Sequence, residues 1–280
     1  MREGSAVIGG KRYFAGLDII RLVAITLVIA IHAVENVWPM QHPGELAGVG
    51  VINSIFITIV YILGRLSVPL FLIITGYLML DRQYSREDLP SFYKRKVWWL
   101  IKATLVWGII YYVLGCCAGR YEFNLIDLAR VVLLLPGENS APHLWYMPMI
   151  IGIYIFIPFI ARCLTICSKK MLQLLLAVAT LYLFALPTIS VILGTRGIDP
   201  INGGVLLPCI GGVYGVYILV GYYIKRYVTI DIINNLKMIA MIGGIVISLS
   251  CACIYQYYPK CGNSSNAVFV NYNIFGQIYI

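Results

Sequence analysis

Charged side chains are scarce in this sequence. Asp, Glu, Lys and Arg together make up 12% of its 280 residues, whereas about 25% is usual in soluble domains. Hydrophobic residues account for 60% of the chain, and the mean hydropathy is +0.85. This balance excludes an ordinary soluble protein and predicts an integral membrane protein, in which each spanning helix needs about 20 mostly apolar residues.

Several motifs of familiar chemistries are also missing. The sequence has no Walker loop, no H-E-x-x-H pair and no G-x-S-x-G elbow, so P-loop, zincin and α/β-hydrolase chemistry have no support. None of the eight cysteines is joined by a histidine at metal-ligand spacing, so we expect no metal site. No pair of interrupted helices recurs in two halves of the chain, as it does in many transporters.

Apolar runs predict an all-α, polytopic transmembrane helix bundle of seven complete spans. A shorter, charged run at 123–136 predicts an interfacial helix. The second span contains Gly64, Pro69 and Gly76, so we expect a tilted or broken helix there. The predicted spans are 15–37, 51–80, 97–116, 144–163, 172–193, 207–224 and 236–256, and an eighth begins near 267.

The two ends of the chain carry further expectations. No A-x-A cleavage site follows the first apolar run, so we expect the first helix to be retained rather than removed as a signal peptide. The sequence ends at Ile280 within an apolar stretch. We therefore expect a single membrane domain over 1–280 that lacks its C-terminal spans.

The distribution of Lys and Arg predicts the orientation. With the N-terminus in the cytoplasm, 14 of these residues fall on inner segments and 4 on outer segments, as the positive-inside rule requires. The same rule accounts for the net charge of +9 without a nucleic-acid partner. The basic run Lys94, Arg95 and Lys96 either follows this rule alone or also binds an anion.

The first span carries four ionisable residues in LDIIRLVAITLVIAIHAVENVW at 17–38. Arg21 and His32 are eleven positions apart, about three helical turns, so they share one face and are separated by roughly 16 Å along the axis. Asp18 and Glu35 each lie three positions from one of them. Charges within a span are costly and usually pair with one another or face a cavity. The four residues therefore form either two local ion pairs that hold helices together or a functional site that extends through the helix bundle.

Three residues outside the first span are also candidates. Arg65 lies within the second span and serves either a site, where it closes on substrate or on Glu35, or a structural ion pair. His143 and Trp145 lie at the outer edge of the fourth span, where they suit a glycan site. Trp at that depth is also an ordinary membrane anchor. His42, in a polar loop, is expected to be inert.

Five segments, in order along the chain, resemble acyltransferase family 3, a family of integral membrane acyltransferases. The opening FAGLDIIRLVAITLVIAIHA resembles that family's first span, with its Arg, ten residues and then His. SVPLFLIITGYLML at 67–80 is similar to the family's V-P-L-F-F-x-x-S-G-Y-L segment, with Thr75 in place of Ser. The other segments are SFYKRKVWWLIKATLVW at 91–107, APHLWYMPMIIGIYIFIPFI at 141–160 and GGVYGVYILVGYYI at 211–224.

This resemblance implies a typically ten-helical enzyme that transfers an acetyl group from cytoplasmic acetyl-CoA to a hydroxyl of an envelope or lipid-linked glycan. It implies that His32 is essential and that Arg21 is required. His32 would be a general base or a transient acyl carrier, oriented by Glu35. Arg21 would pair with the phosphates of CoA, helped by Lys94, Arg95 and Lys96.

The resemblance leaves two other functions open. Some relatives with this fold form the membrane half of a serine racemase, in which the membrane part is thought to serve amino-acid uptake. An inactive, truncated remnant is the third possibility. In each case we expect a multi-pass protein of the plasma membrane, and for the enzyme the partners are the lipid bilayer and a glycan acceptor.

Overall fold

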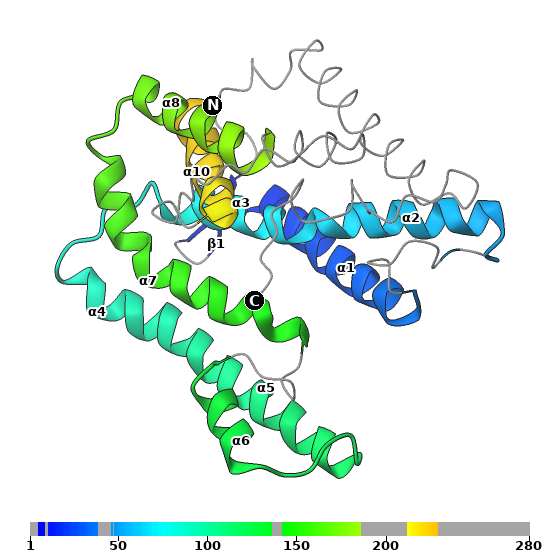
Figure 1. Cartoon of the computed structure of the whole chain (residues 1–280). Helices are drawn as coiled ribbons and strands as arrows, with labels where there is room; N and C mark the ends of the chain where they lie inside the picture. Colours follow the sequence, from blue (N-terminus) through cyan, green and yellow to red (C-terminus); the bar gives the residue numbers. More distant parts are fainter. Residues whose placement is uncertain are drawn as a thin grey trace. The chain divides into compact units, whose positions relative to one another are not determined.

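The computed structural model describes residues 5–8, 11–38, 46, 48–135, 142–185 and 212–228. The chain divides into two compact units, one formed by residues 1–81 with 168–279 and the other by residues 82–167 with residue 280. Figure 1 shows the elements of both units in colours that follow the sequence. Helices dominate both units, as predicted.

The first unit contains an N-terminal pair of short strands followed by helices. The strands pair antiparallel, with Ser5 opposite Phe14, and they are an addition to the predicted all-α fold. The elements of this unit are β1 (Ser5–Ile8), β2 (Lys11–Phe14), α1 (Ala15–Val37), α2 (Val51–Arg65), α3 (Ser67–Met79), α8 (Lys169–Thr180), η3 (Leu181–Ala185) and α10 (Gly212–Tyr227).

Helix α1 packs against α2 (Figure 1). Ala24, Ile31 and Val34 are buried, and their spacing places them on a common helical face. The two helices approach closely because Gly64 has no side chain: a Cβ there would lie 2.5 Å from the Cβ of Ile31. The core of this contact consists of Ile31, Val34, Leu46, Ile57, Tyr61 and Ile62.

The predicted second span is interrupted at Leu66, between α2 and α3. Pro69 has no N–H to donate to the carbonyl one turn earlier, and the Leu66 N–H bonds to the Leu63 carbonyl at 3.0 Å, in the tighter i to i−3 pattern. The Ser67 hydroxyl donates to the Gly64 carbonyl at 2.7 Å. The expectation of a broken helix is therefore confirmed, and the break follows directly after Arg65.

Helices α3 and α10 form the tightest backbone contact described in the first unit. A Cβ on Gly76 would lie 1.9 Å from the Ile218 carbonyl oxygen, and one on Gly221 would lie 2.1 Å from the Ile73 carbonyl oxygen. Helix α8 packs on α10. The Gln173 amide donates to the Tyr223 hydroxyl at 2.8 Å and Lys169 Nζ lies 5.5 Å from the centroid of the Tyr227 ring, so the two helices run in opposite directions.

The second unit is built on one long helical segment, Asp88–Cys117. Tyr93 near its start donates from its hydroxyl to the Ile155 carbonyl at 2.9 Å, which ties it to α7. Near its end, the Tyr112 hydroxyl donates to the Asn124 carbonyl and accepts from the Asn124 N–H. The elements are α4 (Asp88–Phe92), η1 (Tyr93–Val97), α5 (Trp98–Cys117), α6 (Leu125–Val132), η2 (Pro142–Trp145) and α7 (Tyr146–Leu164).

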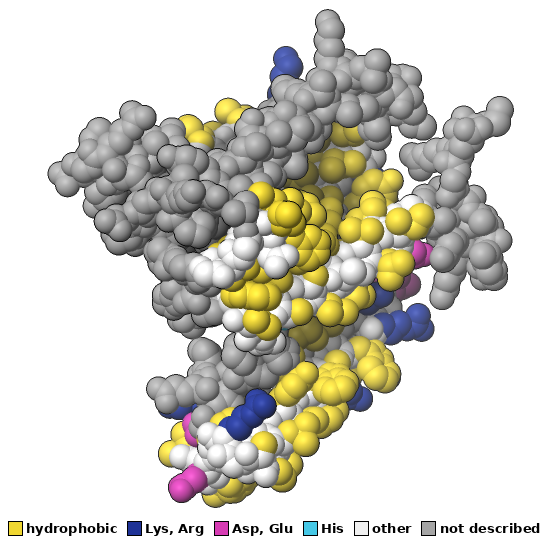
Figure 2. All heavy atoms as spheres, turned by 90° about the vertical axis from the view of Figure 1, so that its right-hand side faces the viewer, with side chains coloured by type: hydrophobic (Ala, Val, Ile, Leu, Met, Phe, Trp, Pro, Cys, Tyr) yellow, Lys and Arg dark blue, Asp and Glu magenta, His cyan; other side chains and the backbone are white. Residues whose placement is uncertain are grey.

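Four of the described helices are long and apolar enough to cross a membrane. They are Gly16–Val37, Ile52–Met79, Asp88–Cys117 and Tyr146–Leu164, which correspond to the first four predicted spans. Hydrophobic side chains cover much of the outer surface of the described helices (Figure 2), as a lipid-facing surface requires. The short α6 coincides with the predicted interfacial helix.

The remaining predicted spans are described in part or not at all. Helices α8 with η3, and α10, begin the fifth span and end the sixth. The spans at 236–256 and from 267 lie outside the described residues, as does His42. The seven-span count and the cytoplasmic N-terminus stay predictions.

Candidate functional site

The candidate site lies where the second half of α1 meets the end of α2. His32 and Glu35 are three positions apart on α1, so their side chains lie on the same side of the helix. Helix α2 runs in the opposite direction and ends at Arg65, immediately before the break at Leu66. Packing at Gly64 and Ile31 therefore brings the guanidinium of Arg65 to the two α1 side chains.

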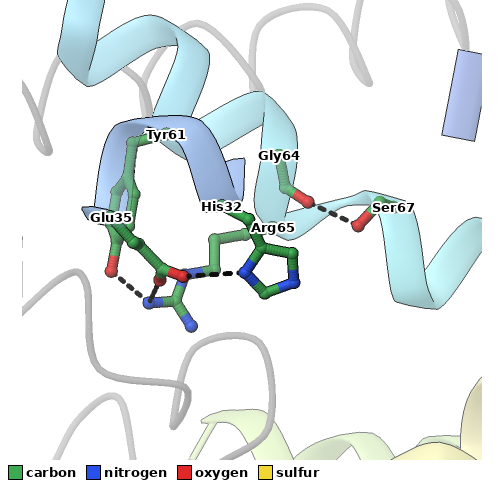
Figure 3. Close-up of polar contacts among 6 residues, drawn as sticks. All are labelled: His32, Glu35, Tyr61, Gly64, Arg65 and Ser67. Atoms are coloured by element: carbon green, nitrogen blue, oxygen red, sulfur yellow. Dashed lines mark hydrogen bonds and ion pairs between the residues drawn. The ribbon is translucent and has the colours of Figure 1, made fainter. Parts of the chain in front are cut away.

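Glu35 is the centre of the resulting polar network (Figure 3). Its Oε2 lies 3.5 Å from His32 Nδ1, and its Oε1 accepts a hydrogen bond of 3.2 Å from Arg65 Nη2. The same Nη2 atom also donates to the Tyr61 hydroxyl. The guanidinium carbon lies 4.6 Å from the centroid of the Tyr61 ring, a distance at which a cation is attracted to the ring face.

Burial increases from His32 towards Arg65. The exposed fraction of the side chain is 42% for His32, 24% for Glu35 and 5% for Arg65. A buried guanidinium needs a compensating anion, and Glu35 supplies it. The network thus places a titratable imidazole at an accessible edge and anchors it, through the carboxylate, to a buried cation.

This arrangement suits proton transfer. A carboxylate next to Nδ1 favours the tautomer in which Nδ1 carries the proton, and the lone pair is then on Nε2. An imidazole in this state can accept a proton from a hydroxyl at Nε2, and the carboxylate stabilises the imidazolium that forms. The pairing of a base with an orienting acid is a general feature of such catalysts.

Arg21 forms a second ion pair on α1. Its Nη1 lies 2.5 Å from Asp18 Oδ1, and the side chains are 43% and 37% exposed. The structure therefore contains both local pairs that the sequence permits, Asp18 with Arg21 and His32 with Glu35. Of the two partners considered for Arg65, substrate and Glu35, the described contact is with Glu35.

The other predicted site residues belong to the second unit. Lys94, Arg95 and Lys96 lie in η1 and are exposed. Trp145 ends η2 and packs edge-to-face on Tyr146, with ring centroids 6.2 Å apart. His143 lies in η2, and its side chain is outside the described part. A joint role of these residues with His32 stays a prediction.

Tyr61 is a member of the network that the sequence analysis did not include. It precedes Arg65 by four positions, so both lie on one face of α2, and this spacing is the signal that could have identified it. Within the described residues, no group of three or more His, Cys, Asp or Glu side chains could hold a metal ion.

A comparison with models of protein families shows to which family this chain belongs. The family 3 acyltransferase model, described as an acyltransferase domain, matches residues 14–279. The chain belongs to acyltransferase family 3. This family membership, together with four apolar helices long enough to span a bilayer, supports a membrane protein with an acyltransferase domain.

Two curated relatives of this acyltransferase family 3 protein share part of its length. Both are named amino-acid racemase and come from Enterococcus faecalis; they are 26% identical over 140 and 139 residues. Each alignment covers 48% of this chain but 17% of the relative, so most of each relative lies outside the match. No solved structure matches this chain.

Proposed function

We propose that this protein transfers an acetyl group from acetyl-CoA to a hydroxyl of a cell-envelope or lipid-linked glycan, with His32 as the general base. The observation that carries the proposal is the contact of His32 Nδ1 with Glu35, on the helix whose Arg and His spacing resembles the first span of the family. A proton on Nδ1 puts the lone pair of the imidazole on Nε2, where it can accept a proton from the acceptor hydroxyl.

The proposed reaction is a direct acyl transfer. His32 Nε2 takes the proton from the acceptor hydroxyl while the oxygen of that hydroxyl attacks the carbonyl carbon of the thioester. The new C–O bond forms and the C–S bond breaks, and the CoA thiolate recovers the proton from the imidazolium. Glu35 stabilises the positive charge on His32 during the step, as an orienting carboxylate does in other base-catalysed acyl transfers.

Arg21 would bind the donor at the cytoplasmic end of α1. CoA carries several phosphates, and a guanidinium pairs with phosphate through two parallel hydrogen bonds. The rise of α1 separates Arg21 from His32 by roughly 16 Å along the axis, a gap that the pantetheine arm of CoA can bridge. The exposed Lys94, Arg95 and Lys96 would add positive charge on the same side of the membrane.

The test uses membrane vesicles that carry the full chain and radiolabelled acetyl-CoA. We expect base-labile label in the glycan fraction with the wild type and a loss of at least about 100-fold with His32→Ala, the scale of a missing general base. His42→Ala is the matched control and should transfer normally, because the sequence places His42 in a polar loop. Transfer by His32→Ala at the wild-type rate would remove the proposal.

A second candidate function is a membrane module for amino-acid uptake, and the two matches to amino-acid racemases favour it. The same vesicles distinguish the candidates when they are supplied with labelled L-serine and no acetyl-CoA. Uptake of serine above that of empty vesicles, with no acetyl transfer by the wild type, would support the module and contradict the acyltransferase proposal.

A further inference from the structure

Arg65 is unusual in its environment. Among the residues that the structure describes, Arg65 is the one Lys, Arg, Asp or Glu that is buried. Its Nε and Nη1 atoms are buried as well. Removing such a charge from water is costly unless an anion and hydrogen-bond acceptors surround it. The position of Arg65 is therefore determined by its partners, Glu35 and Tyr61.

Tyr61 holds the guanidinium in two ways. Its hydroxyl accepts a hydrogen bond from Nη2, and the guanidinium carbon Cζ lies over its ring, 4.6 Å from the centroid. Tyr61 itself is fully buried and belongs to the core between α1 and α2. A fixed ring of this kind restricts the rotamers open to Arg65, and hence the direction in which Nη2 points.

The two carboxylate oxygens of Glu35 face different partners. Oε1 accepts from Arg65 Nη2 at 3.2 Å, and Oε2 lies 3.5 Å from His32 Nδ1, as Figure 3 shows. Because a carboxylate is planar, fixing Oε1 also fixes the direction of Oε2 once the side chain is in place. The orientation of Arg65 is thus transmitted to the imidazole through one rigid group.

We propose that Tyr61 and Arg65 are positioning residues that hold Glu35 against His32 Nδ1 and thereby assign the proton transfer to His32 Nε2. The inference rests on the proposed function and extends it to two α2 residues that touch neither donor nor acceptor in this scheme. It gives Arg65 a different role from substrate binding, because its Nη2 is already bonded to Glu35 and Tyr61 and its side chain is 5% exposed.

The proposal has an electrostatic consequence. The charged and titratable groups in this chain of contacts are His32 and Glu35 on α1, and Tyr61 and Arg65 on α2. The positive charge of Arg65 offsets part of the negative charge of Glu35. Arg65 therefore compensates the charge of Glu35 as well as fixing its direction, and a substitution that keeps the positive charge separates these two effects.

The experiment measures kcat and the KM for acetyl-CoA in acetyl transfer by the full chain in vesicles. We expect Arg65→Gln to lower kcat by about 30-fold to 100-fold and to change the KM for acetyl-CoA by less than about twofold. Arg65→Lys should restore part of the lost kcat but not all of it, because it keeps the positive charge but not the planar guanidinium that fixes the direction of Glu35.

Tyr61→Phe tests the second positioning residue and keeps the ring. We expect kcat to fall by about threefold to tenfold, since the guanidinium loses one acceptor and orients Glu35 less well. Tyr112→Phe is its matched control, because Tyr112 is also buried and also bonds through its hydroxyl, but to the backbone of Asn124 in the second unit. Arg130→Gln, which breaks the exposed pair with Asp127, is the control for Arg65→Gln.

The outcomes separate this inference from the proposed function. If His32→Ala is inactive while Arg65→Gln, Arg65→Lys and Tyr61→Phe keep the wild-type kcat, the positioning role is wrong and the base assignment stands. A raised KM for acetyl-CoA at constant kcat in Arg65→Gln would also overturn the positioning role, in favour of donor binding. If Arg65→Gln does not fold, kcat and KM of Arg65→Lys and Tyr61→Phe decide the question by themselves.

Discussion

Helix α1 carries two acid–base pairs with the same spacing, and they differ in their surroundings. Asp18 and Arg21 are joined at 2.5 Å near the start of the helix, with both side chains more than a third exposed. His32 and Glu35, near its end, are 3.5 Å apart, and Glu35 is also bonded to Arg65 of α2. A spacing of three positions is therefore enough to form an ion pair on α1. Packing against α2 adds a second partner, Arg65, which anchors the His32–Glu35 pair to a buried cation.

The comparison also separates two roles that charge can have in a membrane helix. An accessible cation such as Arg21 is available to an anionic ligand from outside the helix. A cation such as Arg65, bonded to Glu35 and to Tyr61, instead sets the orientation of its neighbours. The predictions that follow test whether the two ends of α1 behave in these two ways.

The largest expected effect is on catalysis by the anchored pair. Glu35→Gln keeps the size of the side chain but removes the charge that faces His32 Nδ1 and Arg65, so we expect kcat for acetyl transfer to fall by about 100-fold. The matched variant Asp18→Asn makes the same chemical change in the exposed pair and should keep kcat within about threefold, since surface pairs contribute little. Initial rates at saturating acetyl-CoA measure both, and equal losses would contradict the comparison.

The second expected effect is on the contact that brings the anchored pair to α2. Gly64→Ala would place a Cβ 2.5 Å from the Cβ of Ile31, so α1 and α2 must separate at the site. Overpacking of this kind costs about 1–3 kcal/mol, and we expect a lower unfolding temperature together with a lower kcat.

The control for this change is Gly152→Ala in α7. A Cβ at Gly152 meets no atom within 4 Å, and Ala is a better helix former than Gly by about 0.5–1 kcal/mol. We expect its unfolding temperature in detergent to be unchanged or slightly higher. If the two variants unfold at the same temperature, the close approach at Gly64 is not what holds the helices together.

The third expected effect concerns the exposed pair and the donor. Arg21→Gln removes the proposed phosphate partner, so we expect the KM for acetyl-CoA to rise by about tenfold, equivalent to about 1.4 kcal/mol, with kcat nearly unchanged. Arg65→Gln should show the opposite pattern, a lower kcat at a similar KM. The same assay at increasing salt should weaken donor binding by the wild type more than by Arg21→Gln, and an unchanged KM would remove the phosphate role.

Much of the helical framework could be predicted from the sequence. The first span was placed at 15–37, and α1 has these bounds, because an apolar run of bilayer length with flanking polar residues determines both ends. The break in the second span follows from Pro69, whose missing N–H is a purely local property. The antiparallel pair β1 and β2 was not predicted, since two four-residue strands leave a weak pattern.

The site could be predicted less completely. The helical repeat placed Arg21 and His32 on one face and gave each an acidic neighbour, and those pairs are present. The sequence left Arg65 with two possible partners, because a lone charge in a span indicates that a partner exists without naming it. Tyr61 was missed because its role depends on the guanidinium turning back along α2, and that rotamer is set by tertiary packing against α1.

The smallest expected effect is on stability at the exposed pair. Asp18→Asn removes a carboxylate whose partner, Arg21, is 43% exposed, so solvent already screens most of the attraction, and we expect the free energy of unfolding to fall by no more than about 0.5 kcal/mol. Glu35→Gln leaves the buried Arg65 without its anion and should destabilise the protein several times more. Thermal unfolding in detergent at low and high salt measures both: the Asp18→Asn difference should vanish at high salt, whereas that of Glu35→Gln should persist. A salt-independent loss in Asp18→Asn as large as that in Glu35→Gln would mean that the two pairs are anchored alike.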